Sequence, residues 1–295
     1  MHSAILSVKL LKTGIFVLLL ISPLIVFSQL APLPNAFAHN DYTHNRPLFD
    51  ALENGYTNIE ADVFLEGDDL IVAHINPFFR LGKTLESLYL KPLARHIKNN
   101  GGEVYKGYSE PVILMIDIKT GADNTYAAIE KVLARYSNIL TSYNNGVVTK
   151  KQVTVVLSGH KPYKMLKAEQ TRLAFIDEDL IKSKQDTTSA NVYELSSCKY
   201  SKILQWTGQG KFPDEQRARL CAYVAMAHKF RKKVRLWASP ENQEVWKELL
   251  NCKVDLICTD KLAALKEFLL SRLPRRETPP PDPWPLSGHE PRRRA

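Results

Sequence analysis

Short apolar runs rich in Val, Ile and Leu alternate with amphipathic stretches from residue 36 to about residue 270. Such runs are typical of the buried strands of a parallel sheet, and apolar residues at helical spacing are typical of the helices that cover it. The strands expected from this pattern are 36–39, 59–65, 112–118, 153–158, 173–176, 192–195, 234–237 and 256–259. Helices are expected over 84–99, 125–136 and 214–230.

Eight strands with helical crossovers in one chain favour a closed barrel over an open sheet. The chain of 295 residues is long enough for such a barrel, which needs roughly 250. The sequence therefore predicts an α/β protein with a single (β/α)8 TIM-type barrel over residues 29–270. Residues 70–74 are expected to form a short arm after the second strand, with its turn at 67–69.

The first 28 residues resemble a secretory signal in composition. Lys9 and Lys12 precede an apolar run over 15–27. This run is short for a membrane span, which needs roughly 20 residues, and Pro23 interrupts it. We therefore expect residues 1–28 to be a cleaved signal peptide and the protein to be secreted or periplasmic, with an uncleaved anchor as the alternative.

Residues 271–295 are rich in proline and arginine, a composition that cannot bury apolar surface and predicts a disordered tail. A solvated extension is favoured over a segment that binds anionic surfaces. The net charge of +9 falls to about +4 in the body of the chain once Lys9, Lys12 and this tail are set aside. This mild excess does not indicate nucleic acid as a partner, and it suits a phosphate-bearing substrate.

Four cysteines lie in the last third of the chain: Cys198, Cys221, Cys252 and Cys258. In an exported protein they can pair, and four thiols allow three connectivities. Their spacing has no C-x-x-C pattern, which argues against a zinc site. Cys221 and Cys258 also fit positions of buried apolar residues, so the disulfide state stays open.

Charged side chains interrupt the predicted strands, where burial is costly unless a charge is paired or bound to a metal. Glu60 and Asp62 lie two residues apart in the second strand, so their side chains point to one face. Asp117 and Lys119 repeat this spacing at the end of the third strand, and His39 ends the first. Because barrel strands deliver their C-terminal ends to one rim, these side chains are expected to converge there.

Three carboxylates close together repel one another, and a divalent cation relieves that repulsion. Ligation by oxygen alone favours a hard ion over zinc. We therefore predict that Glu60, Asp62 and Asp117 hold one divalent cation, Mg²⁺ or Ca²⁺.

Histidine can take and give a proton near neutral pH. His39 and His74, which follows the predicted arm, are expected to be the catalytic pair, one on each side of a bound phosphodiester. Lys119 is expected to hold a phosphate oxygen as a point charge. These residues together indicate metal-assisted cleavage of a phosphodiester.

The order of these segments is similar to that of the glycerophosphodiester phosphodiesterase superfamily of PLC-like phosphodiesterases. The matching segments are His39, Gly55-Tyr56, Glu60-Ala61-Asp62, Ala73-His74, 234–237 and 254–260. The resemblance covers about residues 36–265. It implies a TIM-type barrel with the same cation ligands and the same acid–base pair.

The chain departs from the usual pattern of that superfamily. Asn40 stands where its members have arginine, and the segment 75–111 is shorter than the insertion that many of them carry. Asp117 with Lys119 is similar to the Asp-x-Lys of the related spider-venom phospholipase D enzymes. The segment 85–102 is similar to the altered-inheritance-of-mitochondria protein 6 branch and its bacterial relatives.

The substrate-binding residues expected from the sequence are Asn40, Lys119 and Trp237, the last as a wall of the pocket. The acidic run 177–179 is expected to be a solvated loop.

We expect hydrolysis of glycerophosphodiester or lysophospholipid-like substrates, transient contact with a membrane surface, and a monomer. Two alternatives stay open. One is a catalytically inactive barrel that binds phospholipid head groups, and the other is a phospholipase D-like transferase that leaves a cyclic phosphate.

Overall fold

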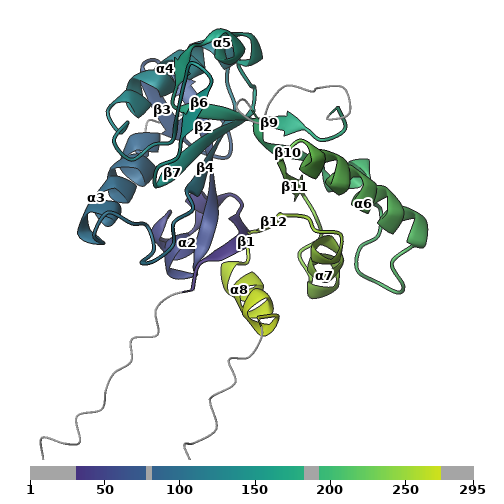
Figure 1. Cartoon of the computed structure of the whole chain (residues 1–295). Coiled ribbons are helices and arrows are strands. Elements are labelled where there is room, and N and C mark those ends of the chain that lie inside the picture. The colour runs from purple at the N-terminus through teal and green to yellow at the C-terminus, as the bar shows by residue number, and fades with distance from the viewer. Residues whose placement is uncertain (1–30, 78–81, 183–192, 274–295) are drawn as a thin grey trace, which may run out of the picture.

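A closed barrel of parallel strands forms the centre of the computed structural model, which describes residues 31–77, 82–182 and 193–273 (Figure 1). Neighbouring strands follow the order β1-β12-β11-β10-β9-β7-β4-β2, and β1 also pairs with β2, which closes the ring. The predicted (β/α)8 barrel is therefore confirmed. Its strands are β1 (Leu33–Ala38), β2 (Tyr56–Glu66), β4 (Val112–Ile118), β7 (Val153–Gly159), β9 (Ala174–Asp179), β10 (Tyr193–Lys199), β11 (Lys233–Trp237) and β12 (Leu256–Thr259).

Helices lie around the outside of this ring (Figure 1). They are α2 (Phe49–Glu53), α3 (Lys91–Asn99), α4 (Ala122–Ala134), α5 (Tyr163–Ala168), α6 (Asp214–Lys229), α7 (Gln243–Asn251) and α8 (Leu262–Ser271), with short turns at η1 (Asp41–Thr43), η2 (Glu86–Leu90) and η3 (Tyr200–Lys202). The predicted arm is present as β3 (Asp69–Val72), antiparallel to β2. A small outer sheet contains β5 (Ser142–Asn144), β6 (Val147–Thr149) and β8 (Thr171–Arg172). No helix among the described residues is long and apolar enough to cross a membrane.

The interior of the barrel is apolar at one level and polar just above it. Alternate residues of each strand point inward, so the residue two positions further along lies on the same face. On six strands that next inward residue is polar. The pairs, apolar then polar, are Phe37 and His39, Met115 and Asp117, Val156 and Ser158, Phe175 and Asp177, Leu195 and Ser197, and Cys258 and Asp260. An apolar floor thus supports a polar mouth at the C-terminal ends of the strands.

Two of the four cysteines are paired. Cys221 on α6 forms a disulfide with Cys252, which directly follows α7. Cys198 and Cys258 are free and buried, and burial raises the pKa of each thiol to about 12. The structure thus selects one pairing where the sequence left the disulfide state open.

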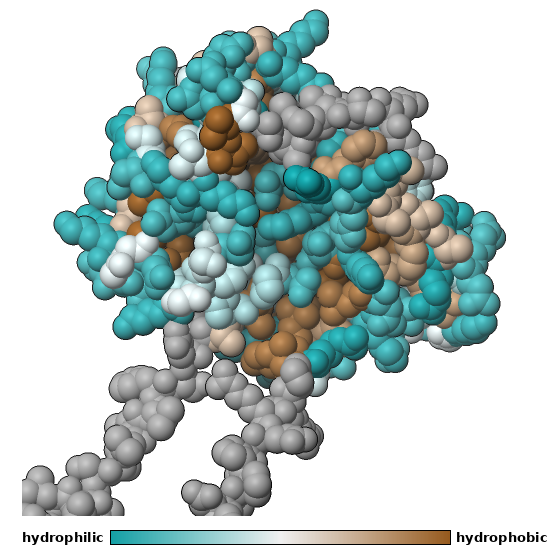
Figure 2. Space-filling model, in the orientation of Figure 1, coloured by the Kyte–Doolittle hydropathy of each residue, from teal (hydrophilic) through white to brown (hydrophobic). Residues whose placement is uncertain are grey.

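The face of the molecule seen in Figure 2 is mostly polar, with apolar residues gathered at its lower centre, where α8 lies. Leu270, in the last turn of α8, is 38% exposed, and Leu273, two residues after the helix, is 52% exposed. The predicted signal peptide and nearly all of the predicted tail lie outside the described residues, so both stay predictions.

Candidate active site

A pocket of about 500 Å³ opens at the C-terminal ends of the barrel strands. All eight site residues expected from the sequence line it: His39, Asn40, Glu60, Asp62, His74, Asp117, Lys119 and Trp237. Four of them lie on β2, β4 and β11, and the other four lie in the loops that follow β1, β3 and β4. The structure therefore brings the predicted residues together in one place.

The three predicted cation ligands form a compact group. Glu60, Asp62 and Asp117 each offer one oxygen, and these atoms all lie within 4.8 Å of one another. Asp62 and Asp117 are register partners on β2 and β4. Burial raises the pKa of Asp62 above its usual range, although the Lys119 ammonium opposes this shift. Close, desolvated carboxylates repel one another, so such a group is unfavourable unless a positive charge lies among them.

One oxygen of this group has no hydrogen-bond partner. Glu60 is 3% exposed, and its Oε1 accepts a hydrogen bond from Arg235 at 3.1 Å. Its Oε2 is buried and receives none. A buried acceptor without a donor is costly, whereas a hard cation binds such an oxygen well. The donor set and this unpartnered oxygen fit a divalent cation.

Lys119 lies between two of the carboxylates. Its Nζ is 3.0 Å from Asp62 Oδ2 and 2.9 Å from Asp117 Oδ1. Burial lowers the pKa of Lys119, but the two carboxylates outweigh burial and raise it, so the side chain stays charged. The ammonium therefore supplies positive charge to the acidic group in the arrangement seen here.

Asp117 is held from its other side by β7. Ser158 Oγ donates to Asp117 Oδ2 at 3.0 Å. The next residue, Gly159, has φ +68°, and a Cβ there would lie 2.5 Å from Asp117 Oδ1 and 2.4 Å from the Ile118 carbonyl oxygen. Only glycine allows β7 to approach this carboxylate so closely.

We expect Gly159→Ala to displace Asp117 and to lower metal affinity and phosphodiesterase activity at least about 10-fold, the loss typical when a partner of a metal ligand is disturbed. Gly101→Ala is the matched control, because Gly101 has φ +76° and open space around it. Both variants place a Cβ on a residue with positive φ, so the unfolding temperature should fall in both. Equal activities of the two variants would show that contact with Asp117 is unimportant.

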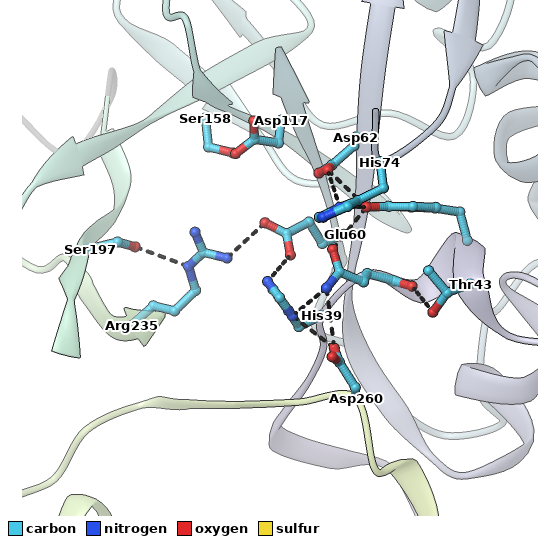
Figure 3. Close-up of polar contacts among 12 residues, drawn as sticks. His39, Thr43, Glu60, Asp62, His74, Asp117, Ser158, Ser197, Arg235 and Asp260 are labelled. Carbon is cyan, nitrogen blue, oxygen red and sulfur yellow. Dashed lines mark hydrogen bonds and ion pairs between the residues drawn. The ribbon is translucent and has the colours of Figure 1, made fainter. Parts of the chain in front are cut away.

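His39 is oriented by a carboxylate (Figure 3). Its Nδ1 is 2.8 Å from Asp260 Oδ1, and its Nε2 is 3.6 Å from Glu60 Oε2. An ionised carboxylate only accepts, so Nδ1 carries the hydrogen and donates it to Asp260. Burial lowers the pKa of His39, but the hydrogen bond to Asp260 and the charges of Glu60 and Asp260 outweigh it and raise the pKa. Nε2 is therefore a strengthened proton acceptor that faces the acidic group.

His74 is oriented by a tyrosine. Tyr42 Oη lies 3.0 Å from His74 Nδ1 and 2.8 Å from Asp62 Oδ2. The Tyr42 hydroxyl has one hydrogen, which points toward its oxygen acceptors. A lone pair of the hydroxyl oxygen can therefore accept the hydrogen of His74 Nδ1. That tautomer leaves Nε2 of His74 free. The His74 side chain is 67% exposed and lies at the mouth of the pocket.

Asn40 links the two histidine positions. It has φ 47°, a left-handed conformation that asparagine tolerates better than most residues. Its Nδ2 lies 2.9 Å from His39 Nδ1, and its Oδ1 accepts a hydrogen bond from Tyr42 at 2.8 Å. Because His39 Nδ1 carries a hydrogen, the acceptor for Asn40 Nδ2 is Asp260 Oδ1 at 3.5 Å. Asn40 lines the pocket as predicted.

The acidic run 177–179 is not a solvated loop, so that prediction was wrong. These residues end β9, and Asp177 and Glu178 are buried. Asp177 Oδ2 is 3.7 Å from Arg235 Nη2, and Glu178 Oε2 accepts a hydrogen bond from Lys232 at 2.6 Å. Arg235 on β11 and Lys232 in the turn before it stabilise these buried acids. The apolar pattern of the sequence does not show these partners, so it predicted that the strand ends before the acids.

Sequence reasoning did not assign roles to four residues of the site. Arg235, Asp177, Asp260 and Tyr42 all contact predicted site residues or one another. A usable signal existed for the first three. Each lies two residues from an inward-facing residue, namely Trp237, Phe175 and Cys258, and so shares its face. Tyr42 lies in η1, where no such periodicity applies.

Asp41, the first residue of η1, is fully buried. Its Oδ2 accepts hydrogen bonds from Leu48 N at 2.6 Å and Tyr89 Oη at 2.9 Å, while its Oδ1 has no partner. Burial raises its pKa from 3.8 to about 6, against the effect of these two hydrogen bonds. The protein is therefore more stable when the Asp41 carboxyl group is protonated.

This shift predicts a pH dependence of stability. The contribution of Asp41 is fully present below about pH 4 and is lost as the pH rises through about 6, a change of about 3 kcal/mol. Asp41→Asn should remove it, so the free energy of unfolding of the variant should gain about that amount on the wild type between pH 4 and 7. Denaturant unfolding across this range measures it, with the exposed Asp123→Asn as control. Parallel curves for Asp41→Asn and wild type would contradict the shift.

The chain is similar to a group of fungal proteins. Altered inheritance of mitochondria protein 6 of Eremothecium gossypii is 27% identical over 277 residues, 80% of this chain and 69% of that protein. The homologue of Arthroderma benhamiae is 27% identical over 278 residues, 83% of this chain and 87% of that protein. Among solved structures, phosphatidylinositol-specific phospholipase C from Listeria monocytogenes has a TM-score of 0.48 and 12% identity, covering 82% of this chain and 93% of that chain.

Residues 26–177 match the model of the AIM6-like phosphodiesterase domain, which confirms the resemblance to the altered-inheritance-of-mitochondria protein 6 branch. This match covers the strands that carry both histidines and the three carboxylates. Because it spans more than half of the chain, the chain belongs to the AIM6-like phosphodiesterase domain family.

Proposed function

We propose that this phosphodiesterase is metal-dependent and hydrolyses glycerophosphodiester or lysophospholipid-like substrates with His39 and His74 as its acid–base pair. The observation that carries the proposal is the unpartnered buried Oε2 of Glu60, within a group of three carboxylates and beside a histidine. What sets this oxygen apart from other unpartnered carboxylate oxygens, such as Asp41 Oδ1, is that it belongs to a group of three close carboxylates at the pocket.

Glu60, Asp62 and Asp117 would hold the cation, Mg²⁺ or Ca²⁺. When bound, the cation would neutralise negative charge on the phosphate oxygens as it builds up in the transition state. With the divalent cation bound next to Lys119, the ammonium would lose its ion pair with either Asp62 or Asp117. The ammonium would then be available to a phosphate oxygen, the role expected from the sequence.

His39 is suited to be the general base. Asp260 fixes the hydrogen on Nδ1 and would stabilise the imidazolium that forms when Nε2 accepts a proton. Nε2 would take the proton of the attacking water as oxygen bonds to phosphorus. His74, on the neighbouring strand unit, would give a proton to the leaving alcohol oxygen as its bond to phosphorus breaks.

The same two residues also serve transfer to a hydroxyl of the substrate itself, which would leave a cyclic phosphate. The experiment is turnover of glycerophosphoglycerol with Mg²⁺ or Ca²⁺, followed by phosphorus NMR. We expect a phosphate monoester and a free alcohol. A cyclic phosphate signal would show the transferase, and an unchanged diester would show a barrel that only binds head groups.

Export is also proposed, with cleavage near Gln29. The disulfide between Cys221 and Cys252 supports it, because disulfides persist in oxidising compartments. Mass spectrometry of the secreted protein should show the loss of residues 1–28. Intact Met1 in a membrane fraction would show an uncleaved anchor.

A further inference from the structure

We propose that the pocket has a second subsite for an anionic head group, formed by Lys161, Lys199 and Lys202. The subsite rests on the proposed function in one respect, because it assigns the substrate class of the same pocket. The substrate would be a phosphodiester whose alcohol carries another negative group, such as a phosphate monoester.

Lys199 and Lys202 lie across the barrel from the carboxylate group, and Lys161 follows β7, which lies between β10 and the carboxylate strands β4 and β2 in the ring. In the ring order β1-β12-β11-β10-β9-β7-β4-β2, β10 is four strands from β2 in either direction. Lys199 ends β10 and Lys202 follows in η3, whereas Glu60 and Asp62 lie on β2. All of them line the same pocket. A diester held at the carboxylates would extend its head group toward β10.

Two of these lysines are held at the wall of the pocket. Lys199 is the register partner of Trp237, and its Nζ lies 5.7 Å from the centre of the Trp237 ring. Lys161 follows β7, and its Nζ donates to the carbonyl oxygen of Asp177 at 2.6 Å. These contacts orient the ammonium groups without neutralising them.

The charges of this half of the pocket are not balanced within the protein. The other pocket cations, Lys119 and Arg235, each contact two carboxylates. Within the described parts of the chain, no carboxylate forms an ion pair with Lys161, Lys199 or Lys202, although the Lys161 ammonium acts on Asp177 and opposes the rise of its pKa on burial. Asp177 is paired with Arg235, which leaves Asp179 as the acid facing the three lysines. An excess of roughly two positive charges remains and favours an anion.

The size of the pocket agrees with a substrate that spans both halves. Its volume of about 500 Å³ lies within the range of pockets that enclose a whole small molecule, about 300–1,000 Å³. A zwitterionic head group would place a cation against the lysines, which is unfavourable. The pocket therefore selects the anionic class.

The test uses two ligands that differ by one phosphate monoester, glycerophosphoglycerol and glycerophosphoglycerol phosphate. Calorimetry measures both dissociation constants with Mg²⁺, and every protein compared carries His39→Ala so that neither ligand is cleaved during the titration. We expect the additional phosphate to tighten binding about 10-fold or more, as hydrogen bonds to charged groups do. The double variant Lys199→Gln/Lys202→Gln should reduce this ratio to near one. Lys229→Gln, an exposed lysine of α6 outside the pocket, should retain it.

Equal binding of the two ligands when all three lysines are present, or an unchanged ratio when Lys199 and Lys202 are replaced, would overturn the subsite. Because binding is measured without cleavage, this result is separate from turnover. If the expected ratio is found but the protein that retains His39 cleaves neither ligand, the proposed function is contradicted and the subsite is kept. Repeating the measurement with the corresponding lyso-lipids distinguishes a lipid head group from its water-soluble form.

Discussion

Replacing His39 or His74 by alanine is expected to lower kcat for a glycerophosphodiester about 10²- to 10⁴-fold, the usual contribution of general acid or base catalysis. The double variant should lose far less than the product of the two losses, because residues that act as a unit are not additive. His228→Ala is the matched control. His228 also pairs with a carboxylate, Asp255 at 2.8 Å, but lies outside the pocket.

The pH profile and the leaving group separate the two roles. A base must be neutral to act, and His39 has a raised pKa because of Asp260 and Glu60. Asp260→Asn removes the carboxylate that raises the pKa of His39, so the acidic limb of kcat/KM should move to lower pH in this variant. A p-nitrophenolate leaving group needs little acid catalysis, so it should rescue His74→Ala and leave His39→Ala impaired. Rescue of His39→Ala instead would exchange the two roles, and near-normal turnover by either variant would remove that histidine from the mechanism.

Glu60→Gln, Asp62→Asn and Asp117→Asn are each expected to remove most activity and to weaken Mg²⁺ binding at least about 10- to 100-fold. Loss of a partner behind a ligand alone has that cost. Each change takes a charged oxygen from a hard cation while keeping the shape of the side chain. Calorimetric titration with Mg²⁺ measures the affinity, and Asp123→Asn on the exposed face of α4 is the control.

Thermal unfolding of the same variants separates a lost ligand from a lost fold. Full Mg²⁺ affinity in all three carboxamide variants would contradict the proposed ligand set.

The fold could be predicted because a parallel barrel strand is buried on both faces, which leaves an unbroken apolar run in the sequence. The carboxylates and the first histidine could be predicted because they interrupt or end such runs. Glu60 and Asp62 are the plainest case, as two acids inside a buried strand. Period-two spacing then placed them on one face without knowledge of the fold.

The supporting residues could not be assigned because their contacts depend on strand order and register. Asp260 reaches His39 only because β12 pairs with β1, and the two residues are 221 positions apart. Arg235 reaches Glu60 across the barrel, 175 positions away. The error at 177–179 has the same origin, since those acids are tolerable in a strand only where Arg235 and Lys232 face them.

A divalent cation held by Glu60, Asp62 and Asp117 is expected to be needed for cleavage. The most direct measurement removes metal with a chelator, then titrates Mg²⁺ or Ca²⁺ back while following release of glycerol from glycerophosphoglycerol. We predict loss of turnover in chelator and its recovery to saturation with a 1:1 stoichiometry. Full turnover in chelator would contradict this expectation and assign the positive charge of the site to Lys119, already placed between Asp62 and Asp117.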